Sequence, residues 1–148
     1  MKTIEMEIAL AAFFNPRVNL IVPNISWGMN IHECDLFILS DSGYLTEVEI
    51  KVSKADLITD QLKKHGHKDR RVKRLFFAVP EALLPIDEHI PDRAGIISVN
   101  KNLRCRIVRK PKLSKGVKFS SAERYKIARL GAMRIWPLKK KIVKLRKI

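Results

Sequence analysis

The fold is decided by one stretch in the middle of the chain, Glu47-Val48-Glu49-Ile50-Lys51-Val52-Ser53-Lys54-Ala55-Asp56. Charged and apolar residues alternate over its first six positions, which is the two-residue period of a half-buried β-strand. Ser53 followed by Asp56 is similar to a capping box, so a helix is expected to begin directly after the strand. The stretch therefore predicts a strand that delivers Glu49 and Lys51 to one end of a sheet.

The charged face of this strand suits metal-dependent phosphodiester hydrolysis. Glu49 and the Ile50 carbonyl offer oxygen ligands to a divalent cation, and Lys51 would orient the attacking water and offset negative charge. A second carboxylate is available from Asp35, which lies in the preceding apolar run. Residues 40–43 have the composition of a tight hairpin turn, so Asp35 is expected to fold back close to Glu49.

These residues resemble the PD-(D/E)xK nuclease superfamily, with Asp35 as its Asp and Glu49-Ile50-Lys51 as its ExK element. A closer resemblance, to the MmcB-like DNA-repair family, covers roughly residues 17–134 and rests on residues 48–56, 75–80 and 94–99. Members of that family typically carry Asp-x-Lys-Trp in the second helix, where this chain has Asp60-Gln61-Leu62-Lys63 and no Trp. The resemblance implies a restriction-endonuclease-like mixed sheet, DNA as the substrate, and Mg²⁺ or Mn²⁺ as the cofactor.

The charge of the chain is unevenly distributed. The protein has 148 residues, which suits one domain with a single core, and a net charge of +15. Residues 1–100 hold 12 Lys/Arg and 14 Asp/Glu, whereas residues 101–148 hold 18 Lys/Arg and one acid, Glu123. A nearly neutral N-terminal part followed by a strongly basic C-terminal part is typical of a nucleic-acid-binding protein. A ribosomal or membrane-surface tail would have the same composition.

The sequence also predicts where the protein resides. No apolar run approaches the roughly 18 residues that a membrane-spanning helix needs, and the first residues do not form a secretory signal. Only two cysteines occur, Cys34 and Cys105, both within strand-like runs. Free thiols in a reducing compartment are therefore expected, and with them a cytoplasmic protein that does not use a membrane.

Two predicted helices carry polar residues that could complete the site. The helix over residues 3–14 places Glu7 between two apolar arcs, either as an accessory carboxylate or as a side chain that reaches out to solvent. In the helix from residue 54 to about residue 65, a helical wheel places Lys54, Gln61 and His65 on the inward side. Gln61 and His65 are also similar to a Gln-x-x-x-Tyr accessory motif of the superfamily, although His65 could simply end a frayed helix.

The remaining pattern predicts further strands and a basic C-terminal segment. Strands are expected at residues 18–26, 75–80, 94–99 and 103–108, and a capped helix from Ser120 to about Arg134 that Pro137 ends. Residues 139–147 form a basic amphipathic end that would either clamp nucleic acid or remain a solvated tail. The predicted DNA-binding residues are basic side chains of these segments: Lys54, Lys63, Lys64, Arg70, Arg71, Arg74, Lys139, Lys140 and Lys141.

The sequence thus predicts an α/β protein, with a nuclease-like core over residues 1–110 and a basic helix and tail over residues 111–148 attached to it. The expected function is that of a small divalent-metal-dependent DNA nuclease in repair, recombination or phage-like DNA processing. Asp35, Glu49, Lys51 and Gln61 are its expected catalytic residues. Two alternatives remain, a catalytically inactive DNA-binding protein of the same fold and a non-enzymatic RNA-binding module. A junction resolvase of this size would require a homodimer.

Overall fold

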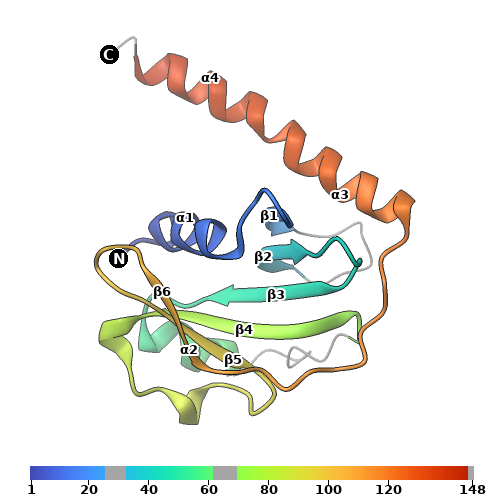
Figure 1. Ribbon diagram of the computed structural model, residues 1–148. Coiled ribbons are helices and arrows are strands. Elements are labelled where there is room, and N and C mark those ends of the chain that lie inside the picture. Colours follow the sequence, from blue (N-terminus) through green and yellow to red (C-terminus); the bar gives the residue numbers. More distant parts are fainter. Residues whose placement is uncertain (26–32, 62–69, 147–148) are drawn as a thin grey trace.

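The protein is built on one mixed sheet of six strands in the order β1-β2-β3-β4-β5-β6 (Figure 1). The computed structural model describes residues 1–25, 33–61 and 70–146. The strands are β1 Leu20–Ile25, β2 Cys34–Leu39, β3 Leu45–Ile50, β4 Val72–Pro80, β5 Gly95–Val99 and β6 Cys105–Arg109. The α-helices are α1 Thr3–Phe14, α2 Lys54–Gln61, α3 Ser121–Met133 and α4 Ile135–Leu145; η1 Glu81–Leu83 and η2 Asp87–His89 are short 3₁₀ helices. The α/β class is confirmed.

The β2–β3 hairpin forms as the sequence predicts. Ser40 and Gly43 close the turn, because the Gly43 N–H donates to the Ser40 carbonyl at 2.9 Å. Gly43 has φ +87°, a conformation that residues with a Cβ rarely adopt. β1, β2 and β3 pair antiparallel, β3, β4 and β5 pair parallel, and β6 returns antiparallel to β5. The parallel strands bring the carboxyl ends of β3, β4 and β5 to one edge of the sheet.

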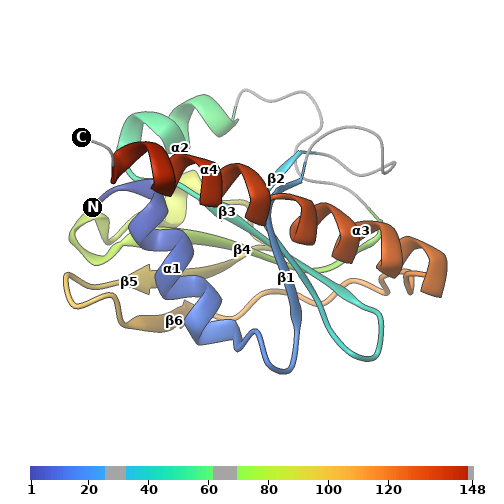
Figure 2. The ribbon, with the colours of Figure 1, turned by 90° about the horizontal axis from the view of Figure 1, so that it is seen from above.

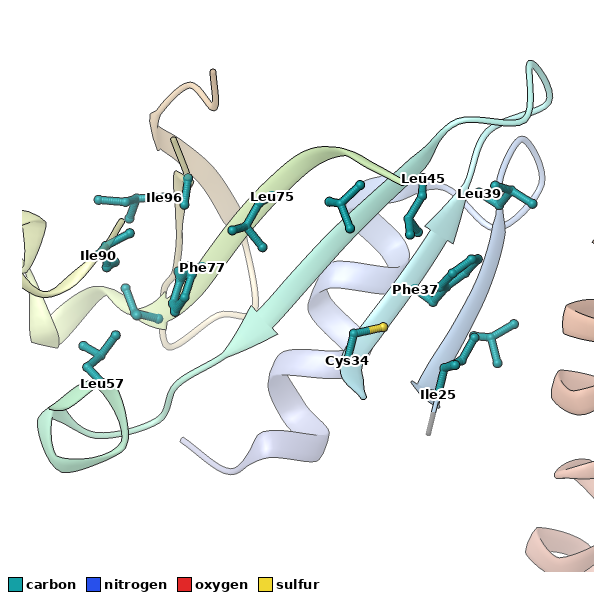
Figure 3. Packing of buried hydrophobic residues seen from close by; sticks show 14 of the residues in the cluster. Ile25, Cys34, Phe37, Leu39, Leu45, Leu57, Leu75, Phe77, Ile90 and Ile96 are labelled. Carbon is teal, nitrogen blue, oxygen red and sulfur yellow. The ribbon is translucent and has the colours of Figure 1, made fainter. Parts of the chain in front are cut away.

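Both faces of the sheet are buried at its central strand β3, which differs from the half-buried strand expected there. Met6 and Leu10 of α1 cover one face, where Val48 of β3 lies. The other face carries Phe77 close to Leu57 of α2, and Leu45 farther along, beside Leu39 (Figure 3). All six residues of β3 are buried, Glu47 and Glu49 included. A strand that is buried on both faces can hold carboxylates only where these find partners.

The segment after residue 110, expected as a basic helix and tail attached to the same domain, contributes two side chains to the core. The Phe119 ring meets the Phe37 ring edge-on, with centroids 5.5 Å apart, and Ile127 of α3 is fully buried. Arg124 fastens the start of α3 to the β2–β3 turn by donating to the Asp41 carbonyl at 3.0 Å. α3 also packs on β1, where Gly131 lies against Val22. α4, by contrast, has no buried residue.

α3 ends at Met133, close to the predicted end at about Arg134, but a further helix, α4, begins directly afterwards at Ile135. α3 and α4 are separated by Arg134 alone and form one long rod (Figure 1). Pro137 lies in the first turn of α4, where its missing N–H leaves no helical hydrogen bond unmade. The proline ring and the absent N–H disturb the turn before Pro137. The break between α3 and α4 therefore falls at Arg134, three residues earlier.

Glu123 is expected to stabilise the protein only above acidic pH. Hydrogen bonds from the Arg71 guanidinium hold the pKa of Glu123 below its ordinary 4.5, and Ser120 adds to the effect. A depressed carboxyl pKa contributes stability that is present above the unfolded-state pKa and is lost as pH falls through the folded-state value. Because 37% of the Glu123 side chain is exposed, solvent screens the pair. Glu123→Gln should therefore lower the free energy of unfolding by under about 1 kcal/mol at pH 7.

Urea unfolding of the wild type and Glu123→Gln at pH 7, and at steps below pH 4.5, measures this difference. The two curves should converge as the acid form of Glu123 accumulates. Glutamine keeps a side-chain oxygen for the Ser120 capping contacts, so the variant removes the charge and little else. A difference that persists unchanged in acid would show that the charge of Glu123 is not what stabilises α3.

The two thiols are free, as expected: Cys34 is buried and Cys105 half-buried. Burial raises the pKa of Cys34, and the nearby carboxylates of Glu47 and Glu49 raise it further; burial also raises the pKa of Cys105. Both sulfurs are therefore held as unreactive thiols. Within the part of the chain that the structure describes, no helix combines the length and the apolar character needed to cross a bilayer.

Candidate active site

Three ionised side chains meet at the carboxyl end of β3. Lys51 directly follows the last residue of the strand, and its N–H still donates to the Ala78 carbonyl of β4 at 3.0 Å. Its side chain is only 9% exposed. The ammonium Nζ lies 3.1 Å from Glu49 Oε2 and 2.8 Å from Asp60 Oδ1. The Phe77 ring, with its centroid 5.9 Å from Nζ, borders the cluster.

The two carboxylates keep Lys51 charged. Burial by itself lowers the pKa of Lys51, but the hydrogen bond and charge of Asp60 and the charge of Glu49 outweigh it, and the pKa rises above 10.5. An ammonium group has three N–H donors. One donates to Glu49, and the ammonium also forms an ion pair with Asp60. The site therefore holds a fixed positive charge in a largely dehydrated position.

Asp35 is brought to the same end of the sheet. The register pairs Leu36 with Val48 and Phe37 with Glu47, and its continuation places Asp35 across from Glu49. Asp35 Oδ2 accepts the Ile50 N–H at 2.7 Å, so the carboxylate continues the hydrogen bonding between the strands where the backbone pairing stops. The predicted juxtaposition of Asp35, Glu49, Ile50 and Lys51 is therefore present.

Asp60 is the residue that the sequence reasoning missed. α2 begins as predicted, because Ser53 Oγ accepts the Asp56 N–H at 3.2 Å. Its buried residues are Leu57 and Asp60, three positions apart and thus on one face. The signal in the sequence that could have identified Asp60 is this spacing. Asp60 lies three residues after Leu57, in a helix that follows Lys51.

The predicted orientation of Lys54 and Gln61 is wrong. Both are exposed, since α2 is rotated so that Leu57 and Asp60, not Ala55 and Ile58, face the sheet. Gln61 Nε2 donates to the Glu88 carbonyl of η2 at 3.4 Å, away from the lysine. Gln61 therefore has the position of a surface contact, and Asp60 takes the inward place expected for it.

The accessory and DNA-binding residues are placed unevenly. Asn24 Nδ2 of β1 donates to Glu7 Oε1 at 3.2 Å. The strand register places Asn24 across from Asp35 of β2, so Glu7 lies at the same end of the sheet as Asp35 but beside the neighbouring strand. Lys63, Lys64 and His65 lie outside the described residues. Arg71 binds Glu123 and lies over the Phe119 ring, 3.8 Å from its centroid.

The other predicted DNA contacts lie on the surface. Lys54 and Arg70 are exposed, and Arg74 of β4 is half-buried. Lys139, Lys140 and Lys141 are all exposed on α4. In Figure 1, α4 rises away from the β1 side of the sheet, whereas α2 lies near β4 and β5; Figure 2 shows the molecule from above. Basic side chains of α4 are thus presented as an extended row beyond the core.

The donor chemistry at the strand ends fits a magnesium ion in part. Asp35, Glu49 and the Ile50 carbonyl are hard oxygen donors, and Mg²⁺ is commonly held by one or two carboxylates with waters completing its coordination. No three His, Cys, Asp or Glu side chains gather as a ready metal-binding group in residues 1–25, 33–61 and 70–146. A cation here would depend on waters or a substrate phosphate for its remaining ligands.

Comparison with known proteins supports the fold alone. The chain is similar to a solved structure described as "SPO1766 protein of unknown function from Silicibacter pomeroyi", with 20% sequence identity and a TM-score of 0.62. The match covers 93% of this chain and 86% of that one. No protein-family model matches the sequence, and no curated protein matches it.

Proposed function

We propose that this protein is a divalent-metal-dependent DNA nuclease of the PD-(D/E)xK type, which hydrolyses phosphodiester bonds. The observation that carries the proposal is the buried lysine Lys51, held between Glu49 and Asp60 beside Asp35. A structural ion pair needs one acid for one base. Here two carboxylates contact one ammonium group, and a third, that of Asp35, binds the N–H of the adjoining Ile50. Carboxylate oxygens are the ligands that Mg²⁺ prefers.

Each side chain has a distinct part in the proposed reaction. Asp35, Glu49 and the Ile50 carbonyl would hold Mg²⁺ or Mn²⁺, which when bound supplies a Lewis acid for the phosphate. Lys51 donates an N–H to the attacking water or to a phosphate oxygen and offsets the charge that develops there. Asp60 fixes the Lys51 side chain in one orientation and keeps it protonated. The basic surface holds the DNA by its phosphates.

The test is a cleavage assay on labelled single-stranded, duplex, flapped and four-way DNA, with matched duplex RNA, in magnesium or manganese and in EDTA. Cleavage of at least one DNA that requires the metal and is lost in Glu49→Gln supports the proposal. Tight DNA binding without cleavage under all conditions would favour an inactive DNA-binding protein of this fold. Preference for RNA without cleavage would favour an RNA-binding module.

Neutralising the lysines of α4 should weaken DNA binding without altering which DNA is cut. Each phosphate contact contributes about 0.9 to the slope of log K against log salt on duplex DNA. The triple variant Lys139→Gln, Lys140→Gln, Lys141→Gln should therefore lower that slope by up to about 3 in a fluorescence-anisotropy titration. The matched control neutralises three exposed bases near β6, Lys101, Arg104 and Lys110, and should lower it less. Equal slopes for both variants would show that α4 does not contact DNA.

A further inference from the structure

The long C-terminal rod carries an apolar face that no residue in the described part of the chain covers. α4 has no buried residue, although Ile135, Leu138, Ile142 and Leu145 follow one another at spacings of three and four. Leu138 and Leu145 are 60% and 62% exposed. This face begins at an open apolar cavity of about 270 Å³ between β1 and the rod, which Ile135 and Leu138 line. DNA phosphates would bind the lysines of α4 but would leave the apolar face in water.

A second uncovered apolar face lies on α1. Met6, Ala9 and Leu10 face the sheet, which directs Ile4 and Ile8, one helical turn apart, to the outside. These two side chains are 61% and 59% exposed. Glu5 and Glu7 flank them on either side of the helix. α1 thus presents an apolar ridge bordered by carboxylates.

The two faces are complementary in charge and in pattern. α4 has an apolar face bordered by Lys139 and Lys141, and no acid occurs in the chain after Glu123. α1 has an apolar face bordered by acids. A lysine-bordered ridge packed on a carboxylate-bordered ridge would bury both apolar surfaces and pair their rims. An anionic bilayer would attract α4 but would repel the acids of α1.

The helix α4 of one chain is held away from its own α1. Arg134, at the junction of the rod, donates to the Asn24 carbonyl of β1, and Gly131 of α3 lies against Val22. These contacts direct the rod outward from the body, so that α4 rises clear of α1 (Figure 1). The complementary surface within reach of α4 is therefore that of another molecule.

We propose that the protein forms a symmetric dimer in which α4 of each chain packs on α1 of the other. The arrangement is isologous, since every chain supplies one α1 face and one α4 face, and two equal contacts close the assembly. Lys140 and Lys144 lie on the opposite side of α4 and remain exposed to solvent, so in the dimer Lys140 contributes to DNA binding while Lys139 and Lys141 pair with the acids of α1. The dimer does not depend on the proposed nuclease activity.

Sedimentation velocity of the full chain over a concentration series tests the assembly. The wild type should sediment as a dimer, and both Ile8→Glu and Ile142→Glu should shift it to the 17.1 kDa monomer. Both positions are exposed, so folding, followed by circular dichroism, should be unaffected. The control is Leu113→Glu, an exposed apolar residue remote from both helices, which should remain dimeric. A monomeric wild type at all concentrations would overturn the proposal.

Cross-linking identifies which α4 covers α1. In a Cys105→Ser background, chains with Ile8→Cys and chains with Ile142→Cys are mixed and treated with a bismaleimide. A cross-linked product joining the two different chains supports the proposal. If the doubly substituted chain instead cross-links internally and stays monomeric, α4 covers its own α1 and the proposal fails. It also fails if the wild type is monomeric and binds vesicles containing phosphatidylglycerol, since the apolar face would then serve a lipid surface.

Discussion

Replacing Lys51 by methionine is expected to abolish hydrolysis and to lower the free energy of unfolding by about 3–5 kcal/mol. Methionine keeps much of the volume of the lysine stem but leaves the carboxylates of Glu49 and Asp60 buried without the cation between them. Uncompensated buried charge is what makes the removal of one partner so destabilising. Loss of the charge near the phosphate should reduce turnover at least about 100-fold. Urea unfolding and single-turnover cleavage measure the two effects.

A double variant separates the two roles of Lys51. Lys51→Met with Asp60→Asn removes one of the two carboxylates that contact the ammonium in the wild type. Part of the lost stability should therefore return, while hydrolysis should stay absent. DNA affinity at fixed salt should change little in either variant, because one charge is a small part of the basic surface. A stability loss of under about 1 kcal/mol in Lys51→Met would mean that water reaches Glu49 and Asp60.

Asp35→Asn should also lower the rate of hydrolysis at least about 100-fold. It should have little effect on the stability of the metal-free protein. The asparagine oxygen can still accept the Ile50 N–H, and repulsion from Glu49 is relieved, so stability should remain within about 1 kcal/mol of the wild type. Bound cation stabilises only the folded state: at 100 times its dissociation constant it adds about 2.7 kcal/mol. For a chain of this length that corresponds to a rise in Tm of roughly 5–10 °C, which Asp35→Asn should lack.

Asp41→Asn provides the matched control. It makes the same chemical change in the exposed turn at the other end of β2, and it should keep both the metal-dependent rise in Tm and the hydrolysis. Calorimetry with and without millimolar magnesium or manganese measures the shift. If Asp35→Asn and Asp41→Asn respond to the cation alike, the metal binds elsewhere. If Asp35→Asn unfolds, its carboxylate is needed for the fold itself.

The sequence was informative wherever the controlling interactions are local. The bounds of α1, the turn closed by Gly43 and the Ser53 cap each depend on residues within a few positions of one another. The meeting of Asp35 with Glu49 also followed, because a short hairpin leaves little choice of register. These local signals together account for the sheet order from β1 to β3 and for most of the candidate site.

Features that depend on distant partners were not predictable in this way. Asp60 was missed because a helix of eight described residues has too few apolar positions to fix its rotation, and the sheet decides which side faces inward. The ion pair of Arg71 with Glu123 was not predictable because the two residues are 52 positions apart. The end of α3 near Arg134 was predicted, but the restart of the chain as α4 at Ile135 was not. For Asp60, a tertiary contact decided an orientation that the local sequence left open.

The burial of Phe119 and Ile127 has a consequence for the order in which the protein folds. Val22 and Phe37 belong to the first quarter of the chain, yet their covering side chains arrive only after all six strands have been made. During synthesis at about 5–20 residues per second, this apolar surface stays exposed for several seconds before Phe119 and Ile127 are added to the chain. The edge of β1 is also unprotected by α3 over that interval, and an uncovered strand edge invites pairing with other chains. The nascent protein therefore depends on its last helices for protection from aggregation before they contribute to anything else.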